Sequence, residues 1–108
     1  MKGIYLKLYV PEFEKHSNGE ALHQWLISKA KSLGIRGGTA IRGIYGFGRH
    51  GDINVDNIFG ESPMEVAFMT CEELASKLLD LLKEEKITLF YIKSEAEYGW
   101  LGEMQESD

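Results

Sequence analysis

The sequence has a single cysteine, Cys71, and no long apolar run. One thiol cannot form an intramolecular disulfide or a cysteine-based zinc site, and this usage fits a reducing cytoplasm. The absence of about 18 consecutive apolar residues argues against a membrane-spanning helix. The first residues alternate with charge and lack the unbroken apolar core of a signal peptide. We therefore expect a cytoplasmic location.

Dense clusters of basic residues are also missing. The chain has 12 Lys and Arg residues against 17 Asp and Glu residues, a formal net charge of −5. A nucleic-acid-binding protein usually presents a basic patch to the phosphate backbone, so we expect no nucleic-acid partner. The only arginines are Arg36, Arg42 and Arg49, which fall within one short stretch. No nucleophile and base stand in a recognisable arrangement, so we expect the protein not to be an enzyme.

Apolar residues recur with two different periods along the chain. A period of two predicts strands over residues 2–10 and 87–93, while helical spacing predicts a helix over 19–33. Ser17 or Asn18 could cap this helix, and Gly34 stands where a glycine often ends one. Thr70 begins a Ser/Thr-x-x-Glu capping box, which predicts that the second helix starts there and continues to about residue 85.

The remaining segments complete one domain. Residues 39–48 and 64–69 read as two further strands, with a bulge expected at Gly43. The order is βαββαβ, which predicts an α+β ferredoxin-like fold with a four-stranded antiparallel sheet and two helices on one face. We expect the domain to span residues 1–94, with an internal loop over 49–63 and an acidic tail over 95–108.

The expected sheet has apolar residues on both faces, although two helices can cover only one. Tyr5 and Tyr9 lie opposite the aliphatic row of the first strand, and the last strand is apolar on both sides. Another subunit is the simpler cover, in a closed ring of identical chains. The alternative is that Tyr98, Trp100 and Leu101 in the tail fold back over the sheet.

Glycine is concentrated in residues 34–51, where seven glycines occur in eighteen positions. Glycine lets backbone amides approach a ligand closely, so consecutive N–H groups can bind an anion. Arg49 adds a forked cation that suits phosphate oxygens, and Arg42 is a second candidate. Taken alone, the pattern also fits a glycine-rich strand end with exposed arginines.

Two motifs in this stretch resemble those of PII signal-transduction proteins. The segments are Gly34-Ile35-Arg36-Gly37-Gly38-Thr39 and Gly46-Phe47-Gly48-Arg49-His50-Gly51. The sequence is more similar to the PII-like family called domain of unknown function 190 than to PII itself. The residues that carry this similarity are Arg42-Gly43-Ile44-Tyr45-Gly46-Phe47-Gly48, together with Lys15 and Gly19 before Leu22. The resemblance covers about residues 2–93.

The resemblance implies a homotrimer that binds an adenine nucleotide in the clefts between subunits. Gly46, Phe47, Gly48 and Arg49 would line the phosphate side, with His50 beside them and Thr39 near the base of the cleft. Val66 and Phe68 would contribute to the base pocket from the neighbouring subunit. Residues 49–63 would be the flexible T-loop, which signals to a target protein such as a membrane transporter.

One departure from PII leaves the identity of the nucleotide open. The loop between the second helix and the last strand has no glycine, only Lys83-Glu84-Glu85-Lys86. PII uses that loop to bind a triphosphate, so the absence of glycine here favours ADP, AMP or cyclic AMP over ATP as the ligand.

Two other hypotheses are a divalent-metal-binding trimer of the same fold and a small enzyme that acts on a nucleotide. His16, His23 and His50 fit no compact metal-ligand spacing.

Overall fold

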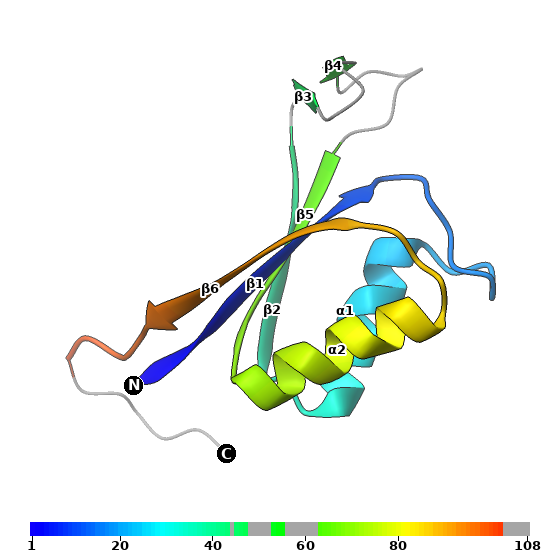
Figure 1. Ribbon diagram of the computed structural model, residues 1–108. Coiled ribbons are helices and arrows are strands. Elements are labelled where there is room, and N and C mark those ends of the chain that lie inside the picture. The colour runs from blue at the N-terminus through cyan, green and yellow to red at the C-terminus, as the bar shows by residue number, and fades with distance from the viewer. Residues whose placement is uncertain (44, 48–52, 56–62, 103–108) are drawn as a thin grey trace.

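The computed structural model describes residues 1–43, 45–47, 53–55 and 63–102. Its elements in chain order are β1 Lys2–Pro11, α1 Leu22–Leu33, β2 Gly37–Arg42, β3 Tyr45–Phe47, β4 Ile53–Val55, β5 Pro63–Thr70, α2 Glu72–Glu84 and β6 Phe90–Glu97. Four strands form an antiparallel sheet in the order β2-β5-β1-β6, and β3 pairs separately with β4 (Figure 1). The predicted ferredoxin-like fold is confirmed.

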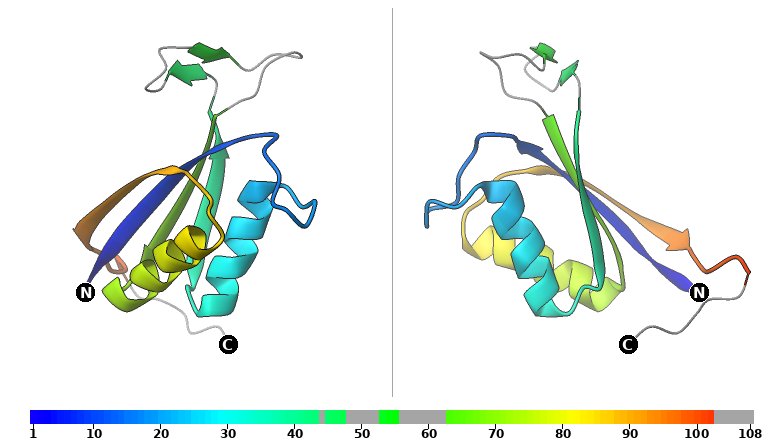
Figure 2. Two further views of the ribbon diagram at one scale, coloured as in Figure 1. Left: turned by 45° about the vertical axis from the view of Figure 1, so that its right-hand side comes forward. Right: turned by 180° about the vertical axis from the view of Figure 1, so that it is seen from behind.

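Both helices pack on the same face of the sheet, as the two views of Figure 2 show. Alternate residues of β1 and β5 point toward them, because successive side chains of a strand point to opposite faces. The buried core consists of Ile4, Leu6, Leu8, Val10, Leu22, Trp25, Leu26, Ala30, Ile35, Met64, Val66, Phe68, Ala75, Leu78 and Leu82. Burying each larger side chain contributes about 1.5–3 kcal/mol before entropy is counted.

The start of α1 differs from the prediction. Its N-cap residue is Ala21, which makes no side-chain capping bond. Asn18 instead accepts a hydrogen bond from the Glu20 amide at 2.8 Å, within the connection that precedes the helix. The predicted cap at Ser17 or Asn18 is therefore wrong, since Asn18 stabilises a turn rather than the helix. Gly34 does end α1, in the left-handed conformation with a φ of 104°.

The capping box predicted at Thr70 is also wrong. Thr70 is the last residue of β5, where it pairs with Ile4 of β1. The N-cap of α2 is Cys71, without a side-chain capping bond. Glu72 and Glu73 stand in the first turn, where acidic side chains interact favourably with the helix dipole.

The last strand is shifted along the chain relative to the prediction. The connection after α2 takes up the first residues of the expected strand, because the Ile87 amide bonds back to the Leu82 carbonyl at 3.0 Å. Strand β6 then pairs with β1 as far as Lys2 opposite Glu97. Residues 95–97 of the expected acidic tail therefore belong to the sheet.

The other side of the sheet has no helix over it, and we call it the open face. Its side chains come from all four strands and include Tyr5, Lys7, Tyr9, Thr39, Ile41, Glu65, Ala67, Met69, Phe90 and Ile92. Trp100 and Leu101 remain 72% and 102% exposed, whereas the ring of Tyr98 lies beside Gly3 and Met69 at one end of this face. Of the three tail residues in the alternative, only Tyr98 therefore lies against the open face, and it covers one end of it.

Candidate functional site

Strands β1 and β2 end at the same edge of the sheet, and this edge leads into the glycine-rich segment. Both strands run antiparallel to β5, so they are parallel to each other. Pro11 at the end of β1 pairs with Pro63, and Arg42 at the end of β2 pairs with Met64. Figure 1 shows that the chain continues from this edge into the small hairpin of β3 and β4.

The hairpin contains part of the predicted phosphate-binding motif. Gly46 pairs with Asn54, and Phe47 pairs with Ile53. The loop predicted over 49–63 therefore includes a short strand, β4, that sequence periodicity did not indicate. Gly48, Arg49 and His50 lie outside the described residues. The predicted bulge at Gly43 does not fall within β2, whose regular pairing ends at Arg42.

Thr39 and Arg42 lie on opposite sides of β2. Thr39 pairs with Ala67 and is exposed on the open face, whereas Arg42 is an odd number of residues away and points to the other side. The structure thus does not bring these two predicted site residues to one surface. Arg42 is the one that turns toward the connection following β1.

Arg42 forms an ion pair with Glu12, a residue that no sequence pattern singled out. Its Nε donates to Glu12 Oε2 at 2.6 Å, and its Nη2 donates to Glu12 Oε1 at 3.4 Å. The contact spans β5, since Glu12 directly follows β1 and Arg42 ends β2. Two-point contacts of this kind fix a guanidinium more firmly than a single hydrogen bond does.

Val66 and Phe68 are buried in the core of the chain itself. They are 0% and 2% exposed and pair with Leu8 and Leu6 on the helix-covered side. These side chains are therefore taken up by internal packing and are not at a surface where a nucleotide base could reach them. Strand β5 presents Glu65, Ala67 and Met69 on the open face instead.

His16 joins three parts of the structure: the connection before α1, α1 itself and the connection after α2. Its ring stacks on Trp25 of α1 with centroids 4.2 Å apart, and its Nε2 lies 2.5 Å from Glu85 Oε1 after α2. The Asn18 amide donates to Nδ1 at 3.1 Å, so the ring proton belongs on Nε2, where it can bond to the carboxylate. The connection before α1 is thus fixed to both helices.

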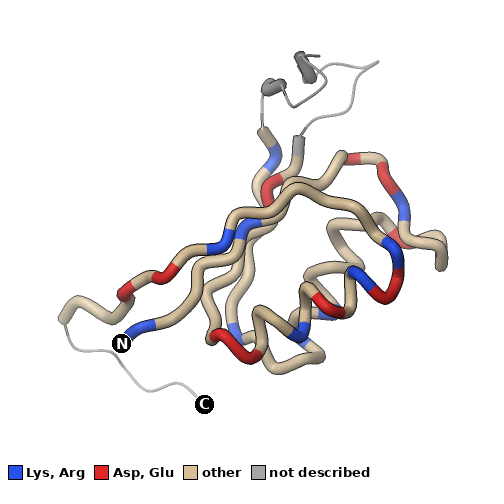
Figure 3. Tube along the Cα trace, viewed as in Figure 1, with Lys and Arg blue, Asp and Glu red and all other residues tan. Residues whose placement is uncertain are grey.

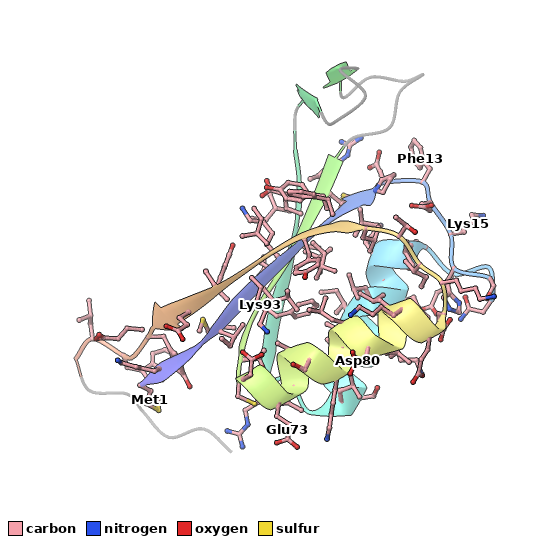
Figure 4. The ribbon with its side chains drawn as sticks, in the orientation of Figure 1. Met1, Phe13, Lys15, Glu73, Asp80 and Lys93 are labelled. Carbon is pink, nitrogen blue, oxygen red and sulfur yellow. The ribbon has the colours of Figure 1, made fainter. Side chains whose placement is uncertain are left out.

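A surface cavity of about 330 Å³ lies beside His16. Lys15 and Ser17 line it from the connection before α1, while Lys86 and Thr88 line it from the connection after α2. Lys86 has a φ of 58°, an unusual conformation for a residue with a side chain, and its amide bonds to the Lys83 carbonyl. Figure 4 shows Lys15 on the connection between β1 and α1.

Within residues 1–43, 45–47, 53–55 and 63–102, no three His, Cys, Asp or Glu side chains are grouped so that they could hold a metal ion. The same part of the chain contains no helix long and apolar enough to cross a membrane. The hypothesis of a metal-binding trimer therefore has no ligand set among the described residues.

A family model for DUF190, whose members are described as uncharacterised, matches residues 3–94. This chain belongs to the DUF190 family. The match runs from Gly3 in β1 to Ser94 in β6, which confirms the family that the glycine-rich motifs suggested.

Solved structures share the fold of this DUF190 chain at low sequence identity. A putative PII-like signalling protein from Thermus thermophilus matches with a TM-score of 0.66 and 16% identity, over 89% of this chain and 88% of that one. CPII from Thiomonas intermedia, bound to ADP and bicarbonate, matches with a TM-score of 0.65 and 16% identity, over 93% and 91%. Another CPII structure, bound to ADP, AMP and bicarbonate, gives a TM-score of 0.62 and 20% identity, over 93% and 91%. These matches confirm the PII-like fold.

Charges of both signs are interspersed over the DUF190 chain, as the tube in Figure 3 shows. On the open face, Lys7 Nζ lies 2.9 Å from Glu65 Oε1, and this hydrogen bond raises the pKa of Lys7. On the helix-covered side, Lys93 of β6 points toward α2 and pairs with Glu72, which lowers the pKa of that carboxyl (Figure 4). The described surface is therefore one of local ion pairs.

Proposed function

We propose that this chain is a PII-like regulatory subunit that binds an adenine nucleotide and signals to a target protein. The observation that carries the proposal is the position of the glycine-rich motif: β2 leads directly from the sheet edge at Arg42 into β3, which contains Gly46 and Phe47. The related fold of CPII occurs in complexes with ADP and AMP. Backbone amides of Gly46–Gly48 and the guanidinium of Arg49 would bind the phosphates.

The open face supports assembly into a homotrimer in this proposal. Ile41, Phe90 and Ile92 are 56%, 69% and 40% exposed there, although each is apolar. A sheet face with this composition is stabilised when another surface covers it, and in a closed ring of identical chains this face is covered in every subunit. The nucleotide would then bind between subunits, close to Thr39 on β2 and to His50.

The nucleotide would act on residues 49–63. A ligand shifts a conformational equilibrium only by the difference between its affinities for the two states. Phosphate contacts at Arg49 would favour one arrangement of this segment, and that arrangement would engage or release a target such as a membrane transporter. No catalytic step is part of this function. The single cysteine fits a reducing compartment such as the cytoplasm.

Calorimetric titration with AMP, ADP, ATP and cyclic AMP tests the proposal. We expect at least one of these nucleotides to bind the wild type, and Arg49→Ala to weaken it about tenfold or more, because a hydrogen bond to a charged group contributes roughly 1.5–3 kcal/mol. Arg36→Ala is the matched control, since Arg36 is exposed at the opposite end of β2. Ile41→Glu should lower both the sedimenting mass and the affinity.

Two results would contradict the nucleotide-binding proposal. If no nucleotide binds the wild type at millimolar concentration, the regulatory mechanism has no ligand. If Arg49→Ala and Arg36→Ala bind equally well, the phosphates lie elsewhere. Sedimentation of the wild type as a monomer at all concentrations would exclude the trimer.

A further inference from the structure

Glu12 places a negative charge in contact with Arg42, at the sheet edge that leads to the proposed phosphate site. The carboxylate accepts hydrogen bonds from Nε and Nη2 at 2.6 and 3.4 Å. The side chain of Glu12 is 16% exposed, whereas that of Arg42 is 49% exposed. Because water screens a shielded charge less well, removing the Glu12 charge changes the nearby electrostatic potential more than removing a carboxylate on the open surface would.

The backbone holds Glu12 at this position. Pro11 ends β1, and the Glu14 amide donates to the Pro11 carbonyl at 3.2 Å, which closes a turn with Glu12 inside it. A second hydrogen bond fixes the connection between Glu14 and α1, since the Leu22 amide donates to the Glu14 carbonyl at 2.8 Å. The negative charge is therefore a built part of this edge of the sheet.

We propose that Glu12 selects the charge of the ligand, by lowering affinity more for nucleotides with more phosphate groups. This inference rests on the proposed nucleotide-binding function. Carboxylates and phosphates bind the same fork of a guanidinium, so a phosphate that approaches Arg42 comes close to the Glu12 carboxylate. Negative charge rises from AMP through ADP to ATP, and the repulsion rises with it.

Glu12 also holds the guanidinium of Arg42 in place, and this second effect must be separated from selection by charge. A loss of positioning would change the affinity for AMP, ADP and ATP by a similar factor, because all three present a phosphate. Repulsion changes the ratio of the three affinities. The ratio is therefore the quantity to measure.

The experiment is calorimetric titration of the wild type and Glu12→Gln with AMP, ADP and ATP, without divalent metal and at constant ionic strength. Glutamine keeps an oxygen that can accept from Arg42 but removes the charge. We expect the gain in affinity for ATP to exceed the gain for AMP by about fivefold or more, with ADP between them. Glu14→Gln removes a charge two positions away and should leave the ratio near that of the wild type.

Each result supports or overturns the inference. Equal gains for the three nucleotides overturn selection by charge and leave the nucleotide-binding function standing. The same graded gain in Glu14→Gln also overturns it, because net charge alone would then be responsible. Absence of binding to both the wild type and Glu12→Gln overturns the inference and the proposed function together. Thermal melting checks that the variants fold. If Glu12→Gln does not fold, the same titrations are made with Glu12→Ala.

Discussion

On the helix-covered face of the sheet, Leu6 and Val66 are completely buried, whereas on the open face Phe90 and Ile41 are 69% and 56% exposed. The same strands supply both faces, through the same alternation of side chains. The covered face is completed by α1 and α2 of the same chain, while the open face holds apolar side chains that nothing in the described chain covers. This difference shows that the single chain buries only one of the two apolar faces of its sheet.

The two faces also place their ion pairs differently. Lys7 and Glu65 lie in the middle of the open face, with the Lys7 ammonium 5.7 Å from the centre of the Tyr9 ring. Lys93 and Glu72 join the edge strand β6 to the start of α2, beside the core rather than within it. Charge is therefore kept out of the covered core but is tolerated in the centre of the open face.

The largest expected effect comes from truncating a side chain of the covered face. Leu6→Ala leaves a cavity in the core and should lower the free energy of unfolding by about 2–5 kcal/mol. Ile92→Ala, on the open face, should cost less than about 1 kcal/mol when urea unfolding is measured at low protein concentration. Equal losses under these conditions would mean that the two faces do not differ as described.

A smaller effect is expected from adding one carbon atom to neighbouring glycines of β2. A Cβ at Gly38 would lie 2.7 Å from two ring atoms of Phe68, whereas a Cβ at Gly37 would meet nothing within 4 Å. Gly38→Ala should therefore lower the free energy of unfolding by about 1–3 kcal/mol through overpacking. Gly37→Ala should change it by less than about 0.5 kcal/mol, and a larger loss there would contradict the packing of β2.

The smallest effect concerns Glu72 at the edge of the covered face. The hydrogen bond from Lys93 lowers the pKa of Glu72 below its ordinary value of 4.5, so folding favours the ionised carboxylate. This contribution is present above pH 4.5 and is lost as the pH falls through the lower, folded-state pKa. In acid titrations followed by urea unfolding, Glu72→Gln should reduce this pH dependence. Glu73→Gln, one position away, controls for the loss of a carboxylate.

The elements with long apolar periods could be predicted from the sequence, whereas their ends could not. Leu6 and Leu8 recur with a period of two in β1, and Trp25 and Leu26 mark the buried side of α1. The predicted caps failed because Thr70 and Asn18 make other contacts, one as part of a strand and the other within a turn. Local patterns of this kind do not reveal which of two competing hydrogen bonds will form.

The candidate site was predictable only where a contiguous motif carries it. Gly46 and Phe47 stand in such a motif, and the family match includes them. The pair of Glu12 and Arg42 joins residues thirty positions apart, and it exists because two parallel strands end at one edge on either side of β5. The pairing of Val66 with Leu8, which directs Val66 into the core, likewise depends on the strand register.

The pairing of Arg42 with Met64 gives the chain between them a fixed starting point and a fixed end. For a connection anchored in this way, each doubling of length adds only about 0.6 kcal/mol of closure entropy. Insertions or deletions between residues 43 and 62 would therefore leave the four-stranded sheet almost unaffected. Relatives can consequently differ in the size of this segment while keeping the same scaffold.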